Sequence, residues 1–249
     1  MCKTYRLLSV ALLSLLLLLA PVFETDNGLK ATALKALPDR FSISASSIKF
    51  ETEVNALYSE INLEQSGLKR SVFEYAYKGY LYLLEQHKLN RSNIISICDF
   101  SQSSRSRRLY VVDLDNKKIL VNTFVAHGRR SGGEYAKSFS NNASSHKSSL
   151  GFYVTEETYF GKHGLTLKIH GLEKGFNDKA DRRNIVIHGS KYVGEGFIKS
   201  NRYNGRSFGC PAVPLNAVDD VIENIKGGSC LFIYYPAKKY LRTSKILNS

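Results

Sequence analysis

The sequence predicts a mainly β domain with long loops, preceded by a small α-helical hairpin. Two segments between residues 48 and 90 carry apolar residues at helical spacing. From residue 94 onward, short runs rich in β-branched and aromatic residues replace that pattern. A stretch at 128–149, rich in glycine, serine and asparagine, predicts a long polar loop. These observations divide the chain into a helical segment (48–92) and a β domain (93–236).

The first 23 residues have the layout of a secretory signal peptide. Lys3 and Arg6 form a positive head, and a nearly unbroken apolar run from Leu7 to Phe23 follows. The alternative is an uncleaved membrane anchor, although the run is shorter than the usual span of about 20 residues. Residues 24–47 show little pattern and are interpreted as a linker. Export would place the protein in the periplasm or the cell envelope.

The helical hairpin is predicted from two apolar faces separated by Gly67. The first face comprises Phe50, Val54, Leu57, Tyr58 and Ile61. The second comprises Val72, Phe73, Ala76, Tyr80, Leu83, Leu84 and His87. Stripes of this width normally face a core, so we interpret the aromatic residues as core rather than as a binding surface.

The strands of the β domain follow in order. The first are IISICDF (94–100), LYVVDLD (109–115) and ILVNTFVAHG (119–128), and the last two are expected to form a hairpin through 115–118. After the long loop come LGFYVT (150–155), LTLKIHG (165–171) and NIVIHG (184–189). A short helix is expected near 214–225, LFIYY (231–235) closes the set, and residues 237–249 are interpreted as a basic tail.

The chain is strongly basic, with a net charge of +13. Loss of a signal peptide containing Lys3 and Arg6 would leave +11, from 13 − 2. Basic charge attracts anionic polymers, and export argues against nucleic acid as that polymer. Peptidoglycan, teichoic acids and lipid surfaces are the anionic partners outside the cytosol, with membrane attachment expected only through an uncleaved signal segment. The alternative is that the charge serves solubility alone.

Three cysteines remain after the signal peptide. Cys98 and Cys230 lie in strand-like sequence and are either buried thiols or one disulfide. Cys210 lies in the loop sequence RSFGCPAVP, between Gly209 and Pro211. An unpaired thiol outside the cytosol is exposed to oxidation, so its presence in a polar, constrained loop indicates a reactive role.

His188 is the candidate base for this thiol. It ends the apolar segment NIVIHG, where the chain turns at Gly189. An imidazole within hydrogen-bond reach would take the proton of Cys210 and form a thiolate–imidazolium pair. The N–H groups of Gly209 and Cys210 would stabilise an oxyanion, and Ser207 would orient the base or the substrate. Taken alone, the pair is also compatible with a strand-end histidine and a buried cysteine.

The array NIVIHG…RSFGCPAVP resembles the catalytic domain of the YkuD-like murein L,D-transpeptidases, over roughly residues 94–236. That family has a strand-end HG and, after a loop, an S-x-G-C motif. The resemblance implies a YkuD-like β-sandwich in which Cys210 is the nucleophile, His188 is the base, and Ser207 and Gly209 belong to the active-site loop. It implies no cofactor.

The sequence departs from the family pattern at two positions. Phe208 stands where the family usually has histidine, and Ala212 stands where it often has arginine. The usual anchor for the carboxylate of the peptide is therefore missing. Arg206 and Arg202 are the candidate replacements, and Gly189 completes this side of the expected substrate site.

The remaining histidines, His127, His146, His163 and His170, show no compact metal-binding spacing, so a zinc site is not expected. Loop-borne His127 and His163 are expected to line the cleft or to be solvated, and His127 is assigned to the substrate-binding set.

The resemblance implies attack of the Cys210 thiolate on the carbonyl after the third residue of a tetrapeptide stem. Terminal D-alanine would leave, and an amine of a second stem or of an envelope protein would take the acyl group. Water as acceptor would make the protein an L,D-carboxypeptidase. The alternative from another class is a non-catalytic peptidoglycan-binding module, which Phe208 and Ala212 favour.

Overall fold

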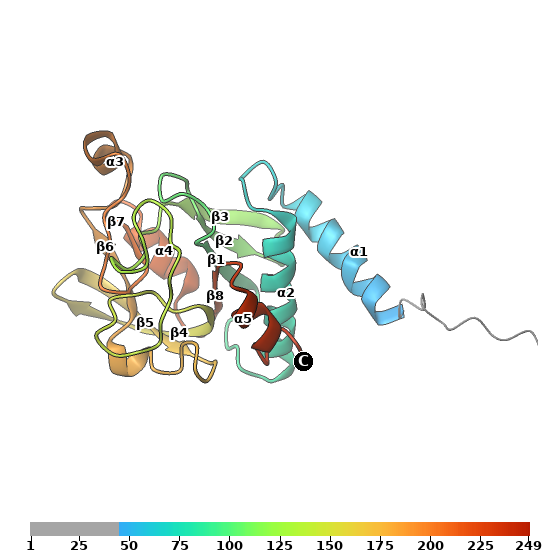
Figure 1. Ribbon diagram of the computed structural model, residues 1–249. Coiled ribbons are helices and arrows are strands. Elements are labelled where there is room, and N and C mark those ends of the chain that lie inside the picture. Colours follow the sequence, from blue (N-terminus) through green and yellow to red (C-terminus); the bar gives the residue numbers. More distant parts are fainter. Residues whose placement is uncertain (1–44) are drawn as a thin grey trace, which may run out of the picture. The chain divides into compact units, whose positions relative to one another are not determined.

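The computed structural model describes residues 45–249 (Figure 1). The predicted signal peptide (1–23) lies outside the described residues, as does the predicted linker (24–47) up to residue 44. Residues 45–47 already belong to the first helix, so the helical segment begins before residue 48. Within the described residues, no helix is both long and apolar enough to cross a membrane.

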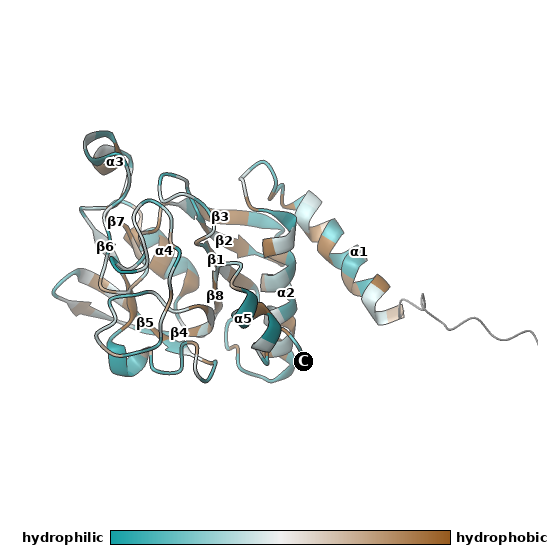
Figure 2. Cartoon of the chain, viewed as in Figure 1, coloured by the Kyte–Doolittle hydropathy of each residue, from teal (hydrophilic) through white to brown (hydrophobic). Residues whose placement is uncertain are grey.

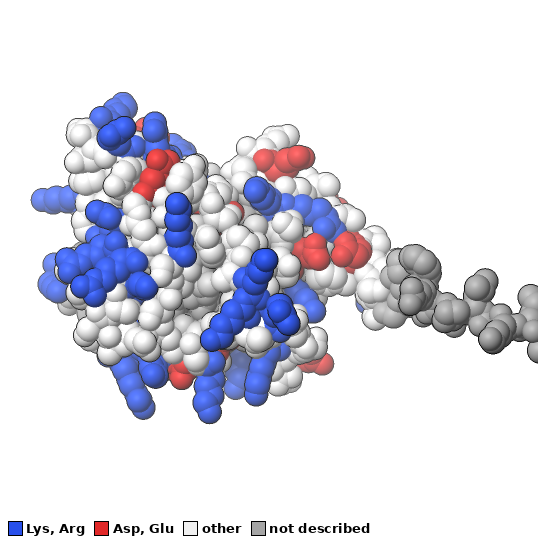
Figure 3. All heavy atoms as spheres, in the orientation of Figure 1, with Lys and Arg blue, Asp and Glu red and all other residues white. Residues whose placement is uncertain are grey.

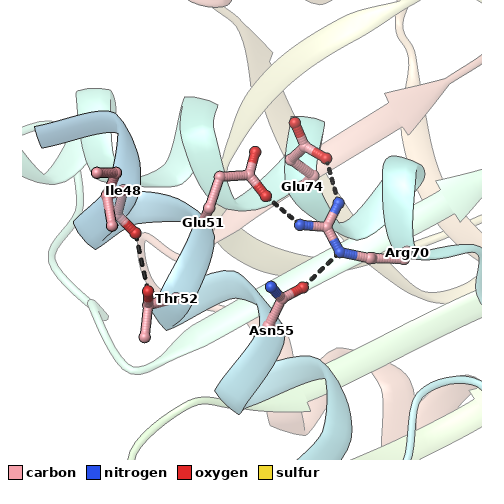
Figure 4. Close-up of polar contacts among 6 residues, drawn as sticks. All are labelled: Ile48, Glu51, Thr52, Asn55, Arg70 and Glu74. Atoms are coloured by element: carbon pink, nitrogen blue, oxygen red, sulfur yellow. Dashed lines mark hydrogen bonds and ion pairs between the residues drawn. The ribbon is translucent and has the colours of Figure 1, made fainter. Parts of the chain in front are cut away.

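The predicted helical hairpin is confirmed as α1 (Ala45–Glu60) and α2 (Arg70–Glu85). Helix α2 buries most of one face, whereas α1 buries only Val54. Arg70 joins the two helices: its guanidinium donates to Asn55 Oδ1 at 2.6 Å and to Glu74 at 2.7 Å, and it also pairs with Glu51 (Figure 4). Exposed ion pairs contribute little, so the buried face of α2 is what attaches the hairpin to the rest of the fold.

The β domain consists of one eight-stranded sheet, which confirms the mainly β prediction. The strands are β1 (Ile94–Asp99), β2 (Leu109–Asp113), β3 (Lys118–Thr123), β4 (Gly151–Gly161), β5 (Gly164–Gly171), β6 (Val186–Ser190), β7 (Ala212–Pro214) and β8 (Cys230–Tyr234). Their order is β3-β2-β1-β8-β4-β5-β6-β7. The pairs β1–β8 and β6–β7 are parallel, and the others are antiparallel.

The two edges of this sheet are joined by the chain that follows β3. Ala126 forms an antiparallel bridge with Ala212 of edge strand β7, and Gly128 bridges to Ser207. Helix α4 (Val218–Ile225) packs against β1, β2 and β3 and also against β5 and β6. The sheet therefore curls around α4, and the expected sandwich takes the form of one curled sheet.

Helix α2 packs against β1 and β8. The apolar residues (brown in Figure 2) concentrate on these packed elements, whereas the long loops are hydrophilic.

The long hairpin of β4 and β5 extends beyond β8, because β4 pairs with β8 only as far as Val154. A short helix, α3 (Glu195–Asn201), lies between β6 and β7.

Residues 237–249, interpreted from sequence as a basic tail, form an ordered part of the core. Helix α5 (Lys238–Thr243) buries Tyr240, and Ile246 beyond it is also buried. The Tyr240 hydroxyl donates to the buried Glu173 at 2.8 Å, and the backbone N–H of Phe152 donates to the same carboxylate at 2.8 Å. These bonds attach the C-terminal segment to β4.

Candidate active site

Cys210 lies in a turn that leads into β7, and Ser207 organises that turn. The Ser207 hydroxyl donates to the carbonyl of Cys210 at 2.6 Å and accepts the N–H of Gly209 at 3.0 Å. Gly209 has φ +133°, and a Cβ at this position would lie 2.9 Å from the carbonyl oxygen of Lys147. The serine and glycine of the motif therefore set the backbone that presents the thiol.

The Gly209 N–H donates to the Ser207 hydroxyl. It is therefore not free to act as the oxyanion donor that the sequence predicted. The backbone N–H of Cys210 makes no bond to another backbone group of residues 45–249. Of the predicted pair of donors, it is the one without a backbone or Ser207 partner.

The long polar loop is held against this turn. Ser148 is buried, donates to the Gly209 carbonyl at 3.1 Å and accepts the Gly128 N–H at 3.0 Å. Arg183, in the short helix η1 (Asp181–Arg183), donates to the Lys147 carbonyl at 2.6 Å. Sequence reasoning missed Arg183 and Ser148, because no motif links distant loop residues to the cysteine turn.

His188 lies on β6 and is almost fully buried. Its Nδ1 is 2.9 Å from the carbonyl oxygen of Gly189, and a carbonyl can only accept, so Nδ1 carries the hydrogen. Nε2 is then left with a free lone pair and can act as a base. Gly189 lies against Leu215 and Val218, and its carbonyl accepts the hydrogen bond from the His188 ring.

The parallel pairing of β6 and β7 places Cys210 beside Val186, two residues before His188 on β6. His188 pairs with Ala212, and Cys210 precedes Ala212 by two residues. The Cys210 Sγ lies 3.6 Å from the carbonyl oxygen of Asn184, two residues before β6 begins. Two residues of a strand span about 7 Å, and this is the separation along the strands between the backbone of Cys210 and the level of His188. The thiol and the imidazole form no direct hydrogen bond with each other in the unliganded protein.

The electrostatics of the unliganded site favour neutral groups. Burial raises the pKa of the Cys210 thiol, and the Val186 N–H and the charge of Arg183 only partly oppose it. Burial lowers the pKa of His188, the Gly189 carbonyl opposes this change, and His163 and then Lys162 reinforce it. These directions differ from the predicted thiolate–imidazolium pair, because both groups lose water and neither contacts the other.

His163 covers the face of His188. The two rings stack with centroids 4.4 Å apart and an interplanar angle of 21°. His163 is exposed at the tip of the β4–β5 hairpin, so a segment far from the motif in sequence reaches over the base. Of the two predicted environments, cleft or solvent, the side chain has solvent exposure, and β4 extends beyond its predicted apolar run to carry it there.

The prediction that His127 lines the cleft is wrong. His127 is fully buried, and its Nδ1 accepts from the guanidinium of Arg108 at 2.8 Å. Burial and the charge of Arg108 lower the pKa of His127 to about 3. Arg108 is also fully buried and donates to the Val125 carbonyl at 3.1 Å. Through these two hydrogen bonds, Arg108 holds the chain that follows β3, at Val125 and His127, against the core.

The other predicted substrate residues lie at the surface. Arg206 is exposed, and its guanidinium donates to the Gly132 carbonyl at 3.2 Å. Arg202 is exposed at the C-terminus of α3. Phe208 is 62% exposed, whereas Ala212 is fully buried in β7. A long charged side chain at position 212 would therefore have to enter this packed strand pair.

The remaining cysteines and histidines form no further centre within residues 45–249. Cys98 and Cys230 are both buried free thiols, which decides between the two sequence alternatives. In the described part of the chain, no three histidine, cysteine or carboxylate side chains gather in a way that would hold a metal ion.

Comparison with known proteins identifies one family. A family model described as an L,D-transpeptidase catalytic domain matches residues 64–234, which include α2 as well as the sheet. No curated protein sequence matches the chain.

Several solved structures resemble part of the chain. They include an L,D-transpeptidase from Mycobacterium smegmatis, with 9% identity and a TM-score of 0.36 over 57% of this chain and 59% of that one. L,D-transpeptidase 1 from Mycobacterium tuberculosis has 10% identity and a TM-score of 0.31 over 57% and 62%. A helical cell shape determining protein from Campylobacter jejuni has 15% identity and a TM-score of 0.34 over 62% and 54%. The chain thus spans less than two thirds of the length of each of these proteins.

Proposed function

Because the chain belongs to the family of L,D-transpeptidase catalytic domains, we propose that it is a cysteine L,D-transpeptidase acting on peptidoglycan stem peptides. Membership supports a peptidoglycan-related function and the enzyme class. The observation that carries the finer proposal is the local arrangement of Cys210 and His188. This proposal is supported by the Ser207-bonded turn, which presents the thiol beside Val186, and by the imidazole two residues further along β6, whose Nδ1 is bonded to Gly189 and whose Nε2 has no hydrogen bond within residues 45–249.

The proposed reaction begins with proton transfer from the Cys210 thiol to Nε2 of His188 as sulfur attacks the stem carbonyl. The Cys210 N–H would donate to the oxyanion that develops. The intermediate then collapses: the bond to terminal D-alanine breaks, and the imidazolium returns its proton to the departing amine. A thioester remains on Cys210.

An amine acceptor completes the proposed transfer. It would attack the thioester carbonyl, lose a proton to His188 and release the thiol as the new amide forms. An amine of a second stem would give a cross-link, and an envelope protein is another acceptor of the same chemistry. Water in its place would give an L,D-carboxypeptidase. We further propose that the protein reaches the cell envelope through the signal peptide at 1–23.

A non-catalytic peptidoglycan-binding module is the second candidate. Three observations favour it: the raised pKa of the Cys210 thiol, the cover of His163 over His188, and Phe208 and Ala212 at positions where the family has other residues.

The test is product analysis with tetrapeptide-bearing muropeptides. The protein and a Cys210→Ala variant are incubated with the muropeptides, and the products are read by mass spectrometry. We expect loss of D-alanine and a thioester adduct on the protein, both absent from the variant. Dimers would identify a transpeptidase, and free tripeptides a carboxypeptidase. A folded protein with a free thiol that yields neither product nor adduct would support the binding module instead.

A further inference from the structure

Three cations from separate segments approach the Cys210 turn, and we call them the cationic rim: Arg129, Lys162 and Arg183. Arg129 lies in the long polar loop, and its backbone N–H donates to the Ser207 carbonyl at 2.7 Å. Its guanidinium lies over the ring of Phe208, 4.6 Å from the centroid. Because Phe208 and Arg129 are both exposed, this stacked pair forms a solvent-facing platform two residues before the thiol.

The other two members of the cationic rim, Lys162 and Arg183, lie in the β4–β5 hairpin and in η1. Lys162 is exposed at the tip of the β4–β5 hairpin and precedes His163, whose ring stacks on His188. Burial lowers the pKa of His188 and the charge of Lys162 adds to that effect, whereas burial raises the pKa of Cys210 and the charge of Lys162 opposes it; Lys162 is therefore within Coulombic reach of both groups. Arg183 has Nη2 only 3.2 Å from the position that a Cβ of Gly209 would take.

The cationic rim lacks carboxylate partners within residues 45–249. None of its three members forms an ion pair there, and neither does Arg206 of the motif. By contrast, Lys168 on the same hairpin pairs with Glu157 at 2.6 Å. Figure 3 shows a group of lysine and arginine side chains on the side of the molecule where Figure 1 labels β6 and β7. Positive potential of this kind attracts anionic ligands.

We propose that the cationic rim selects stem peptides with free carboxylates over stems whose carboxylates are amidated. The inference rests on the proposed function, and it names the substrate class of that same site. Amidation keeps the shape of a stem but removes negative charge. It therefore weakens the Coulomb attraction between the stem and the cations of the rim. Since Ala212 provides no single anchoring cation, the selection is spread over residues that flank the thiol.

The test measures binding to the Cys210→Ala chain, which cannot turn over the peptide. Two synthetic tetrapeptide stems with a meso-diaminopimelate third residue are compared by calorimetric titration. One has free carboxylates, and the other is amidated at its second and third residues. We expect the free stem to bind about tenfold more tightly at low salt, and the difference to shrink as salt is added.

Single variants then assign the difference to the rim. Arg129→Gln and Lys162→Gln should each weaken the free stem by about 2- to 5-fold and leave the amidated stem nearly unchanged. Lys168→Gln is the matched control, because it removes a lysine from the same hairpin that already pairs with Glu157. It should change neither affinity. Thermal unfolding checks that each variant is folded. Because Lys162 is exposed, its substitution should disturb the fold least.

The outcomes separate the two proposals. Equal affinity for the two stems, together with D-alanine release by the unmodified protein, would overturn the inference and leave the proposed function in place. A preference for the free stem that neither rim variant reduces would also overturn it. Absence of binding of both stems and of D-alanine release would overturn the proposed function and the inference with it.

Discussion

At the scale of single residues, Gly209 is a position of the site where a side chain has little room. It has φ +133°, and a Cβ would lie 2.9 Å from the Lys147 carbonyl oxygen and 3.0 Å from Cδ1 of Ile185. We expect Gly209→Ala to lower the free energy of unfolding by about 2–4 kcal/mol, from backbone strain and overpacking together. Urea denaturation measures this loss, and muropeptide turnover should fall with it because the turn presents the thiol.

Gly227→Ala is the control for that variant. Gly227 also has a positive φ, +82°, but nothing lies within 4 Å of its Cβ position. It should cost only the strain, about 1–2 kcal/mol. If both variants lost the same stability, close contact at Gly209 would not be the reason for the glycine there.

The pKa directions of Cys210 and His188 predict how the thiol reacts in the unliganded protein. Iodoacetamide alkylates the thiolate, and burial raises the pKa of the Cys210 thiol above its ordinary value of 9.0. The alkylation rate should therefore keep rising through pH 9. Rates followed by mass spectrometry from pH 5 to 10 test this, with Cys210→Ala marking any labelling of other thiols. A plateau reached below pH 7 would show the ion pair instead.

At the scale of elements, the β4–β5 hairpin controls the environment of the base. His163→Ala would expose the face of His188 to water and remove a neighbouring charge, so the pKa of His188 should rise toward its ordinary value of 6.5. His163→Phe keeps the ring cover and removes only the charge. Because burial is the largest cause of the lowered pKa, His163→Phe should raise it less.

Titration of the His188 ring by NMR measures both values directly and does not depend on turnover. An equal rise in the two variants would mean that the charge of His163, rather than its cover, lowers the pKa.

The elements differ in how far the sequence predicts them. The apolar faces around Val72 and Leu83 predict α2, because its periodic face is the one that is buried. Strand β7 has only the three residues Ala212–Pro214, and it exists because Ala126 and His188 pair with it from either side. Local periodicity carries no information about such pairing.

The same limit applies to the C-terminal segment and to the site. Helix α5 has two lysines at its start, and Tyr240 is buried through contacts with residues distant in sequence, the carboxylate of Glu173 and the ring of Phe176. The motif residues Ser207, Gly209 and Cys210 could be predicted as one turn, because they are neighbours in sequence. Arg183 and His163 could not, since the fold alone brings them to that turn.

At the scale of the whole described molecule, the helical hairpin and the sheet share one core. Phe152 of β4 stacks on Phe232 of β8, with centroids 4.2 Å apart, and its ring also contacts Gly79 of α2. The family model likewise includes α2 in the matched region, residues 64–234. Helix α2 therefore packs into the same core as the sheet and lies within the region that matches the family.

This shared core predicts opposite signs for two substitutions that look alike in sequence. Gly79 and Gly196 both lie in helices, where replacement of glycine by alanine normally stabilises by about 0.5–1 kcal/mol. A Cβ at Gly79 would lie 1.9 Å from Cζ of Phe152, whereas nothing lies within 4 Å of one at Gly196. Gly79→Ala should therefore destabilise by about 1–3 kcal/mol, because α2 must move away from the sheet, and Gly196→Ala should be neutral or stabilising. Urea denaturation of the two variants measures this difference. If Gly79→Ala proved as stable as Gly196→Ala, the Phe152 ring would have to move aside at little cost. This contact would then not hold α2 against the sheet.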